Sequence, residues 1–416
     1  MNHYLEKFGF QPPQIDLKPN SNLGLIVVIP CFDEPNIIDA INSLATATPP
    51  NCQTEVIVVI NHGVHQSVKI KNHNQKSALA IAEWQKLNKP FFHLHVIRAF
   101  DLPKKHAGVG LARKIGMDEA VARFHMVNRD GVIVCFDADA TCDQNYFMAI
   151  ENHFNDHLKT PGAAIKFEHP IAGLDFDDDI YEGIINYELF LRYYNQGLKY
   201  ANLPYAFHTV GSSMAVRSSA YQKQGGMNKR KAGEDFYFLH KIIALGHFTE
   251  INTTTVRPSP RTSDRVPFGT GKAITDWIQN STNEYLTYDF RIWEIIKDFC
   301  AIIPQLQQSD LKGTTLYKTA KYKCLIDFLE QNNFHLNLEE IRTNSTSEPA
   351  FLKRFFVWFN AFRILKLVHF LRDEQFPNQP LVEQAKLMAI KRGFYRAEIN
   401  NKDLLIAYRT FEAKKN

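Results

Sequence analysis

The octapeptide VIVCFDAD, residues 132–139, decides the fold that the sequence predicts. Its first five residues are rich in β-branched and aromatic types and precede polar ones, which is typical of a strand buried on both faces of a parallel sheet. Open α/β sheets bind ligands at the carboxyl ends of their strands. Because side chains alternate along an extended chain, we expect Asp137 and Asp139 to point to the same side and to share one divalent cation, Mg²⁺ or Mn²⁺. Taken alone, the tripeptide is also typical of a solvated turn or a helix cap.

The composition of the chain bounds its class. A chain of 416 residues is long enough for about two or three domains. Its 48 basic and 44 acidic residues give a net charge of +4 and no basic stripe, so we expect no nucleic-acid partner. The six cysteines show no CxxC spacing and are typical of reduced thiols. The first residues do not resemble a signal peptide and no segment approaches an uninterrupted apolar span, which predicts a cytoplasmic protein.

Strand-like and helix-like segments alternate in the first part of the chain. Apolar strands are expected at 25–29, 55–60 and 93–99, and helices at 36–45, 76–87 and 110–123. This alternation predicts right-handed crossovers and a mostly parallel sheet flanked by helices.

After Gly271 the pattern changes to long amphipathic helices. They are expected at 277–299, 316–331, 349–372 and 381–395. We therefore predict an N-terminal arm (1–22), an α/β domain (23–275) and a helical C-terminal domain (276–416).

Two strand ends carry polar residues that are expected beside Asp137. In IPCFDEPN, residues 29–36, Pro30 is expected to end its strand, so that Asp33 and Glu34 project at the carboxyl edge of the sheet. They are expected to contact a nucleotide or to cap the following helix. The strand at 55–60 is followed by Asn61, whose carboxamide offers both a hydrogen-bond donor and an acceptor.

Two further segments pair glycines with charged residues. The segment KKHAGVGLAR, residues 104–113, places Gly108 at a helix start and Arg113 one turn into the helix, where both favour an anion, although a solvated basic loop fits the same pattern. A dinucleotide-binding fingerprint is excluded because its third glycine is absent. Farther on, GEDFYFLH, residues 233–240, places Glu234 and Asp235 in a first helical turn, where the helix dipole keeps a carboxylate ionised.

The order and spacing of these motifs over residues 23–255 resemble family 2 glycosyltransferases with the GT-A fold. The resemblance implies a metal-dependent, inverting transfer of a sugar from a nucleoside diphosphate to an acceptor hydroxyl. Asp139, with Asp137 alongside, would hold the metal against the diphosphate, Asp235 would be the catalytic base, and Glu234 would orient the acceptor. The implied donor-binding residues are Pro30, Asp33, Glu34, Asn61, Gly108, Arg113 and Asp137.

The chain departs from the family pattern at two of these positions. Asp33 replaces an Asn, and Asn61 stands where the family has an Asp that reads the base, so both UDP and GDP sugars stay open as donors. The loop at 257–272 carries Arg261 and Arg265, expected to contact the donor diphosphate or an anionic acceptor, or to serve as a linker.

The sequence leaves the acceptor and two rival functions open. The acceptor is expected to be a glycan, a lipid or a small molecule. The aromatic and basic segment 351–372 is expected to pack against the catalytic domain, with peripheral contact to the inner face of a membrane as the alternative. A sugar-phosphate nucleotidyltransferase and a catalytically silent glycan-binding or scaffold protein are the rival functions.

Overall fold

The computed structural model describes residues 2–263, 269–279, 284–395 and 400–414, which form two compact units. Unit 1 comprises Met1–Ile180 and Thr209–Thr275, and unit 2 comprises Tyr181–His208 and Asp276–Lys415. Residues 181–208, which were expected in the α/β domain, therefore group with the helical residues. The reason is helix α6 (Asp178–Tyr200), whose Gly197 packs so closely on the Trp293 ring that a Cβ there would lie 2.3 Å from it.

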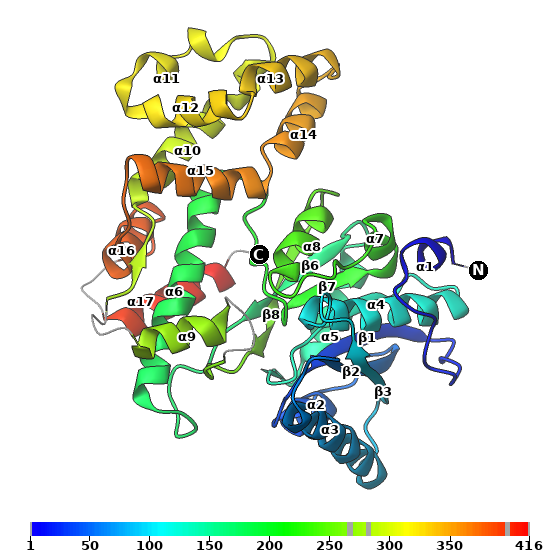
Figure 1. Cartoon of the computed structure of the whole chain (residues 1–416). Coiled ribbons are helices and arrows are strands. Elements are labelled where there is room, and N and C mark those ends of the chain that lie inside the picture. The colour runs from blue at the N-terminus through cyan, green and yellow to red at the C-terminus, as the bar shows by residue number, and fades with distance from the viewer. Residues whose placement is uncertain (1, 264–268, 280–283, 396–399, 415–416) are drawn as a thin grey trace. The chain divides into compact units, whose positions relative to one another are not determined.

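Unit 1 is built on a mostly parallel sheet. Within its described residues the sheet has eight strands in the order β3-β2-β1-β4-β7-β6-β8-β5; β7 runs antiparallel to β4 and β6, and β5 runs antiparallel to β8. The α/β class, with helices flanking the sheet, is confirmed (Figure 1). The strands are β1 (Leu23–Cys31), β2 (Gln53–Gly63), β3 (His93–Leu102), β4 (Val132–Cys135), β5 (Thr141–Cys142), β6 (Gly162–Phe167), β7 (Met214–Arg217) and β8 (Thr249–Arg257).

Helices cover both faces of this sheet, as the alternation of side chains requires. Val27 and Val58 belong to one apolar core together with residues of α2, α3 and α5. Val28 and Val59 point to the other face and meet α4, where a Cβ added at Gly116 would lie 2.4 Å from Val28 Cγ1. Gly116 thus lets α4 pack directly on the sheet. The helices of unit 1 are α1 (His3–Phe8), α2 (Ile37–Ala45), α3 (Val68–Leu87), α4 (Val109–Met126), α5 (Tyr146–Asp156), α7 (Ser218–Lys223) and α8 (Glu234–Ile243).

The expectation that Pro30 ends its strand is wrong, because β1 continues to Cys31 and Pro30 pairs with Val59 of β2. Two residues earlier, the Val28 carbonyl accepts a hydrogen bond from the Phe136 N–H at 3.0 Å, so Pro30 turns its nitrogen toward the same side, that of β4. Because β4 ends at Cys135, no residue of that strand needs a hydrogen bond from position 30. The lack of an N–H in proline therefore breaks no bond of the sheet.

The N-terminal arm joins unit 1 through polar side chains of α4. The Tyr4 hydroxyl donates to Asp118 at 2.7 Å, and the Gln14 N–H donates to Glu119 at 2.7 Å. Fully buried Arg123 binds both carboxylate oxygens of Glu55 on β2 and also the Leu17 carbonyl at 3.0 Å. The arm therefore completes the burial of α4.

Unit 2 is helical and has its own core, which contains edge-to-face or tilted ring contacts among Phe299, Phe334, Phe355 and Phe359. A short two-stranded ribbon accompanies the helices. Besides α6, the described elements of unit 2 begin with the last residues of α9 (Thr270–Gln279), because the boundary between the units falls after Thr275. The others are β9 (Leu286–Thr287), α10 (Phe290–Ile302), η1 (Ile303–Gln307), η2 (Leu311–Gly313), α11 (Thr315–Lys318), η3 (Ala320–Tyr322), α12 (Lys323–Gln331), α13 (Phe334–Thr343), α14 (Glu348–Trp358), α15 (Ala361–Glu374), β10 (Gln379–Pro380), α16 (Leu381–Lys391) and α17 (Asn401–Ala413).

The segment 351–372 forms two helices, α14 and α15, because Asn360 caps the second by accepting from the backbone N–H groups of Phe362 and Arg363 at 3.1 Å. Several of its apolar side chains, including Phe355 and Leu367, are buried, whereas Val357 is exposed; α14 and α15 pack on η1, α10, α12 and α13 of unit 2. Among the described residues, the structure contains no helix with the length and apolar character needed to span a bilayer.

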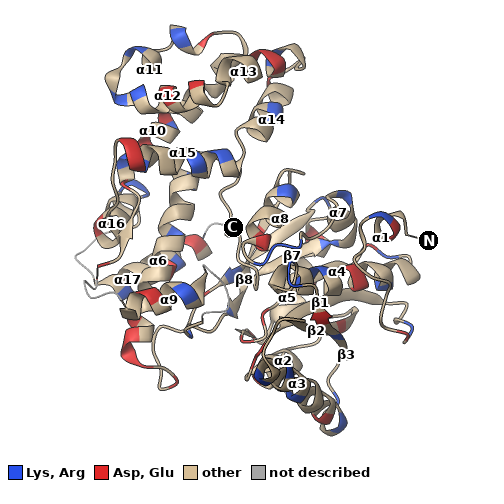
Figure 2. Cartoon of the chain, in the orientation of Figure 1, with Lys and Arg blue, Asp and Glu red and all other residues tan. Residues whose placement is uncertain are grey.

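Charged residues of both signs are interspersed along the helices and loops of each unit (Figure 2). Unit 1 in addition buries several of them, among them Glu55 and Arg123. Such buried charges are tolerated only when they are paired, so we expect them to dominate the response of unit 1 to mutation.

The Arg123→Met substitution tests this expectation. It leaves the carboxylate of Glu55 buried without its guanidinium, and we expect the free energy of unfolding to fall by about 3–5 kcal/mol in urea denaturation. The control Arg98→Met removes an exposed cation from β3 and is expected to change stability by less than about 0.5 kcal/mol. Equal effects of the two substitutions would contradict the assigned role of Arg123.

Candidate active site

The carboxyl end of β4 is a tight turn, not an extended strand. After the bond from Phe136 to Val28 the chain turns, and the Ala140 N–H donates to the Asp137 carbonyl at 3.1 Å. The strand alternation that was expected to align Asp137 with Asp139 therefore does not apply. The two carboxylates instead accept hydrogen bonds from two different arginines, Arg113 and Arg261.

Arg113 joins the turn after β4 to helix α8. Its side chain is buried, and its Nη2 donates to Asp137 Oδ1 at 2.5 Å while its Nη1 donates to Glu234. Gly211 makes room for the guanidinium, because a Cβ there would lie 2.5 Å from Nη1. Burial alone would lower the pKa of Arg113, but the two carboxylates raise it, so the group stays cationic.

Glycines at the start of α4 let the segment before α8 approach Arg113. A Cβ at Gly108 would lie 3.0 Å from Lys231 Cα, and a Cβ at Gly110 would lie 2.2 Å from the Arg230 carbonyl oxygen. Gly108 was expected to contact the donor. It lies at the N-terminus of α4, and the atoms nearest to a Cβ added there belong to Lys231. This close approach delivers Glu234 to Arg113.

Glu234 and Asp235 begin helix α8 behind Gly233, which adopts the left-handed conformation at φ 69°. Glu234 is buried, and desolvation raises its pKa to about 7 against the opposing effect of Arg113. Asp235 is partly exposed, and its carboxylate accepts from the Phe236 N–H at 2.7 Å and from the Gly211 N–H. Burial raises the pKa of Asp235 as well, again against Arg113. Glu234 is thus held by an arginine, whereas backbone groups orient Asp235.

Arg261 joins the turn after β4 to the loop after β1. Its Nε donates to Asp139 Oδ2 at 2.8 Å, and its Nη2 donates to the buried carboxylate of Glu34. Burial raises the pKa of Asp139, Arg261 opposes this effect, and the charges of Asp137 and Glu34 add to it. The expected site residue Arg265 lies outside the described residues.

A buried polar network surrounds Asn61 and Asp33, and it was not predicted from the sequence. Fully buried Asn74 on α3 donates to the Asn61 carbonyl at 2.9 Å and accepts from the Asp33 N–H at 2.8 Å. The Asp33 carboxylate lies 2.6 Å from His73 Nδ1, and Asp33 adopts a left-handed φ of 50°. Asn61 Oδ1 is buried without a hydrogen-bond partner. Asn74 was detectable, because it falls on the same helical stripe as the buried residues Ala78, Ile81 and Trp84.

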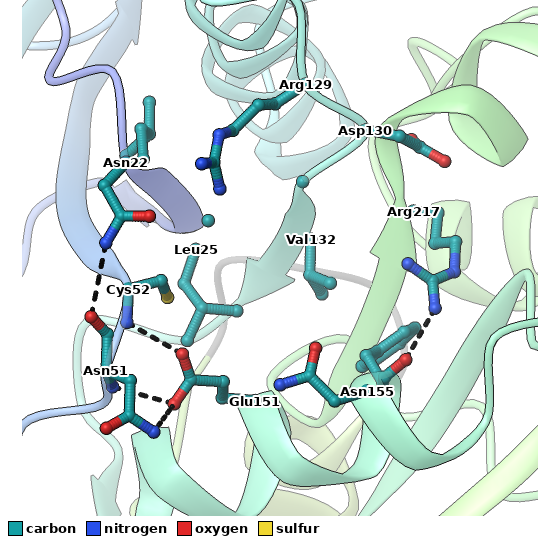
Figure 3. Close-up of a pocket in the computed structure, with 14 residues that line it drawn as sticks. Asn22, Leu25, Asn51, Cys52, Arg129, Asp130, Val132, Glu151, Asn155 and Arg217 are labelled. Carbon is teal, nitrogen blue, oxygen red and sulfur yellow. Dashed lines mark hydrogen bonds between the residues drawn. The ribbon is translucent and has the colours of Figure 1, made fainter.

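A separate cavity of about 390 Å³ lies at the opposite edge of the sheet, where β1 and β4 begin (Figure 3). Its charged groups hold loops in place. Glu151 accepts from the backbone N–H groups of Asn51 and Cys52 at 2.8 and 2.7 Å, and Arg217 donates to the Phe154 carbonyl at 2.7 Å. The residues predicted from the sequence gather at the other edge, so the candidate site lies there.

Within the described residues, no group of three or more His, Cys, Asp and Glu side chains is arranged to hold a metal ion by itself. The turn after β4 offers the carboxylates of Asp137 and Asp139. This donor set fits Mg²⁺ or Mn²⁺ when a phosphate-bearing substrate completes the shell, because such ions are commonly bound through one or two carboxylates plus substrate oxygens.

Comparison with known proteins gives weak likenesses. No protein-family model matches this chain, and no curated protein matches it. The chain is similar to residues 1–349 of TarS from S. aureus in complex with UDP-GlcNAc, at 14% identity and a TM-score of 0.41, over 91% of this chain and 95% of that one. It is also similar to the mannosyltransferase PcManGT from Pyrobaculum calidifontis in complex with GDP-Man and Mn²⁺, at 13% identity and a TM-score of 0.36, over 98% and 92%. At these scores neither likeness assigns a function to this chain.

The link between Arg113 and Glu234 predicts strong thermodynamic coupling. Arg113→Met leaves Glu234 buried without a cation, whereas Glu234→Gln removes the charge that needs one. We expect the double variant to be more stable than the sum of the single effects by about 2 kcal/mol in urea denaturation. The matched pair Lys241→Met and Glu234→Gln, with Lys241 exposed on the same helix, should be additive within about 0.5 kcal/mol. Additivity in both cycles would rule out the buried link.

Proposed function

We propose that unit 1 is a glycosyltransferase that moves a sugar from a nucleoside-diphosphate donor, UDP or GDP, to an acceptor hydroxyl. One observation carries the proposal: among the described residues, five carboxylates gather at the carboxyl edge of the sheet around two guanidinium groups. The carboxylates are those of Glu34, Asp137, Asp139, Glu234 and Asp235, and the guanidiniums are those of Arg113 and Arg261. Such a site favours a ligand that brings a divalent cation together with an anionic group.

The carboxylates of Asp137 and Asp139 would hold the Mg²⁺ or Mn²⁺ ion. Such a cation would neutralise the charge that develops on the departing diphosphate. Arg113 donates a hydrogen bond to Asp137, and Arg261 donates one to Asp139. Both guanidiniums are therefore positioned to bind oxygens of a diphosphate beside these carboxylates.

The nucleoside would lie at the ends of β1 and β2. Pro30 and Glu34 border this edge, Asp33 offers a carboxylate for ribose hydroxyls, and the buried oxygen of Asn61 is without a partner. A carboxamide that accepts through Oδ1 and donates through Nδ2 complements the adjacent N–H and C=O groups of uracil or guanine. Gly108 acts indirectly, by allowing the chain to pack on the start of α4.

Asp235 would take the proton of the acceptor. In a single inverting displacement, the acceptor oxygen forms a bond to the anomeric carbon as the bond from that carbon to the diphosphate breaks. The hydroxyl proton passes to the carboxylate of Asp235, which is partly exposed and oriented by the N–H of Phe236. Glu234, held on Arg113, would orient the acceptor by its position beside the base.

Release of UDP or GDP from a panel of sugar donors, with water as the acceptor, tests the proposal. We expect release to require Mn²⁺ or Mg²⁺ and to fall by about 100-fold or more in Asp235→Asn, because the proton acceptor is lost. Donor affinity should be unchanged in that variant. Asp156→Asn, the same change at an exposed position on α5, is the control. Absence of metal-dependent release with every donor would refute the function, and a wild-type rate in Asp235→Asn would refute the assigned base.

Asn61 is expected to determine how tightly the base is held. Asn61→Ala removes both hydrogen-bonding groups, and we expect the Kd of UDP or GDP, measured by calorimetry, to rise about tenfold. Asn155→Ala, an exposed asparagine at the opposite edge of the sheet, is the matched control. If both variants bound the nucleotide as the wild type does, the nucleoside would lie elsewhere.

A further inference from the structure

We propose that Arg261 is an internal counter-ion of the metal site, which a divalent cation must displace from Asp139 before the donor can be bound productively. The inference rests on the proposed function, because it assumes that Asp139 is a metal ligand. It adds to that function a competition within the chain and an order of events at the site.

The first ground is that one guanidinium serves two carboxylates from two strand ends. Arg261 bonds to Asp139 in the turn after β4 and to Glu34 in the loop after β1. Glu34 is 2% exposed, and the side chains of Arg261 and Asp139 are each 20% exposed. The cation at this point therefore neutralises carboxylates that are largely removed from water, which is the condition under which losing it is most costly.

The second ground is that the guanidinium and a metal ion need the same oxygen atoms. Asp139 Oδ2 accepts from Arg261 Nε at 2.8 Å, and a divalent cation would approach such an oxygen to about 2.0–2.6 Å. Two cations within a few ångströms of each other also repel. Binding of the metal to Asp139 and binding of Arg261 to Asp139 are therefore mutually opposed.

The third ground is that Arg261 can leave Asp139 without moving its backbone. The chain just before Arg261 is fixed: Pro258 and Pro260 are buried, and Arg257 Nη1 donates to Asp143 at 2.6 Å. Arg261 Nη2 also bonds to Glu34, which leaves a second anchor when Nε is released. In the proposed exchange, a side-chain rotation about this anchor would free Asp139 and turn the guanidinium toward a neighbouring anion.

The consequence is cooperation between metal and nucleotide. A metal ion alone must break the Arg261 bond without compensation, so its affinity is reduced. A nucleoside diphosphate supplies oxygens both for the metal and for the released guanidinium, so each ligand raises the affinity of the other by the same factor. Removal of Arg261 would strengthen binding of the metal alone and weaken this mutual effect.

Titration with Mn²⁺, with the free ion measured by electron paramagnetic resonance, tests the proposal directly and needs no turnover. In the absence of nucleotide, we expect Arg261→Gln to bind Mn²⁺ about tenfold more tightly than the wild type, and Arg261→Lys to lie between the two. In the presence of UDP or GDP, the gain in Mn²⁺ affinity caused by the nucleotide should be smaller in Arg261→Gln than in the wild type.

Two controls locate the effect. Arg257→Gln removes the same charge from the same loop stem, where it pairs with Asp143, and should leave the Mn²⁺ affinity near that of the wild type. Asp139→Asn should abolish the tight Mn²⁺ binding of Arg261→Gln in the double variant. Thermal unfolding of each variant establishes that it is folded.

The possible failures are distinguishable. If Mn²⁺ binds in the presence of nucleotide but Arg261→Gln is no tighter than the wild type and Arg257→Gln, the counter-ion role is refuted and the transferase proposal stands. If no variant binds Mn²⁺ even with UDP or GDP, the metal-dependent function itself is refuted, and the counter-ion role with it.

Discussion

The buried guanidinium of Arg113 is the interaction on which the rest of unit 1 depends. It lies in the first turns of α4 and bonds both to Asp137 after β4 and to Glu234 at the start of α8. Arg113 and Glu234 are 121 positions apart in the sequence, and the buried carboxylate of Glu234 would be costly without a cation. The glycines at 108, 110 and 211 belong to the same arrangement, because each removes a side chain that would keep the partners apart.

Helix α4 is unusual in that it is buried on almost every side, from Gly110 to Phe124. One of its faces packs on β1 and β2 through Gly116, and others meet the N-terminal arm and α8. Its two buried arginines, Arg113 and Arg123, bind acids at opposite ends of the helix. Helix α4 thus connects the carboxyl edge of the sheet, where the reaction is proposed, with the buried Arg123–Glu55 pair at its other end.

At the carboxyl edge, the five described carboxylates lie around Arg113 and Arg261, and burial raises the pKa of Asp139, Glu234 and Asp235. Arg113 is buried and bonds to two acids, whereas Arg261 reaches the site from a loop and is more exposed. From this difference we propose that Arg261 exchanges its partner for a ligand while Arg113 keeps its acids.

The local pattern of the sequence predicted much of this fold. The strands at 25–29 and 55–60 and the helices at 36–45 and 110–123 lie within or almost within β1, β2, α2 and α4, because periodicity is a property of neighbouring residues. The placement of acids at strand ends was predicted for the same reason, since the carboxyl ends of parallel strands share one edge of the sheet. The prediction that Pro30 ends its strand was wrong, because the effect of a proline there depends on where the neighbouring strand β4 ends.

Residue order alone therefore determined the α/β class, and it predicted Asp137, Asp139, Glu234 and Asp235 as candidate site residues. Tertiary structure alone decided which charges pair: Arg113 with Glu234 across 121 positions, and Arg261 with Glu34 across 227. It also decided that Asn74 supports Asn61, and that α6 joins the helical unit. The physical reason is that helix and strand periodicity arises between near neighbours, whereas the pairing of buried charges depends on which surfaces the folded chain brings together and closes to water.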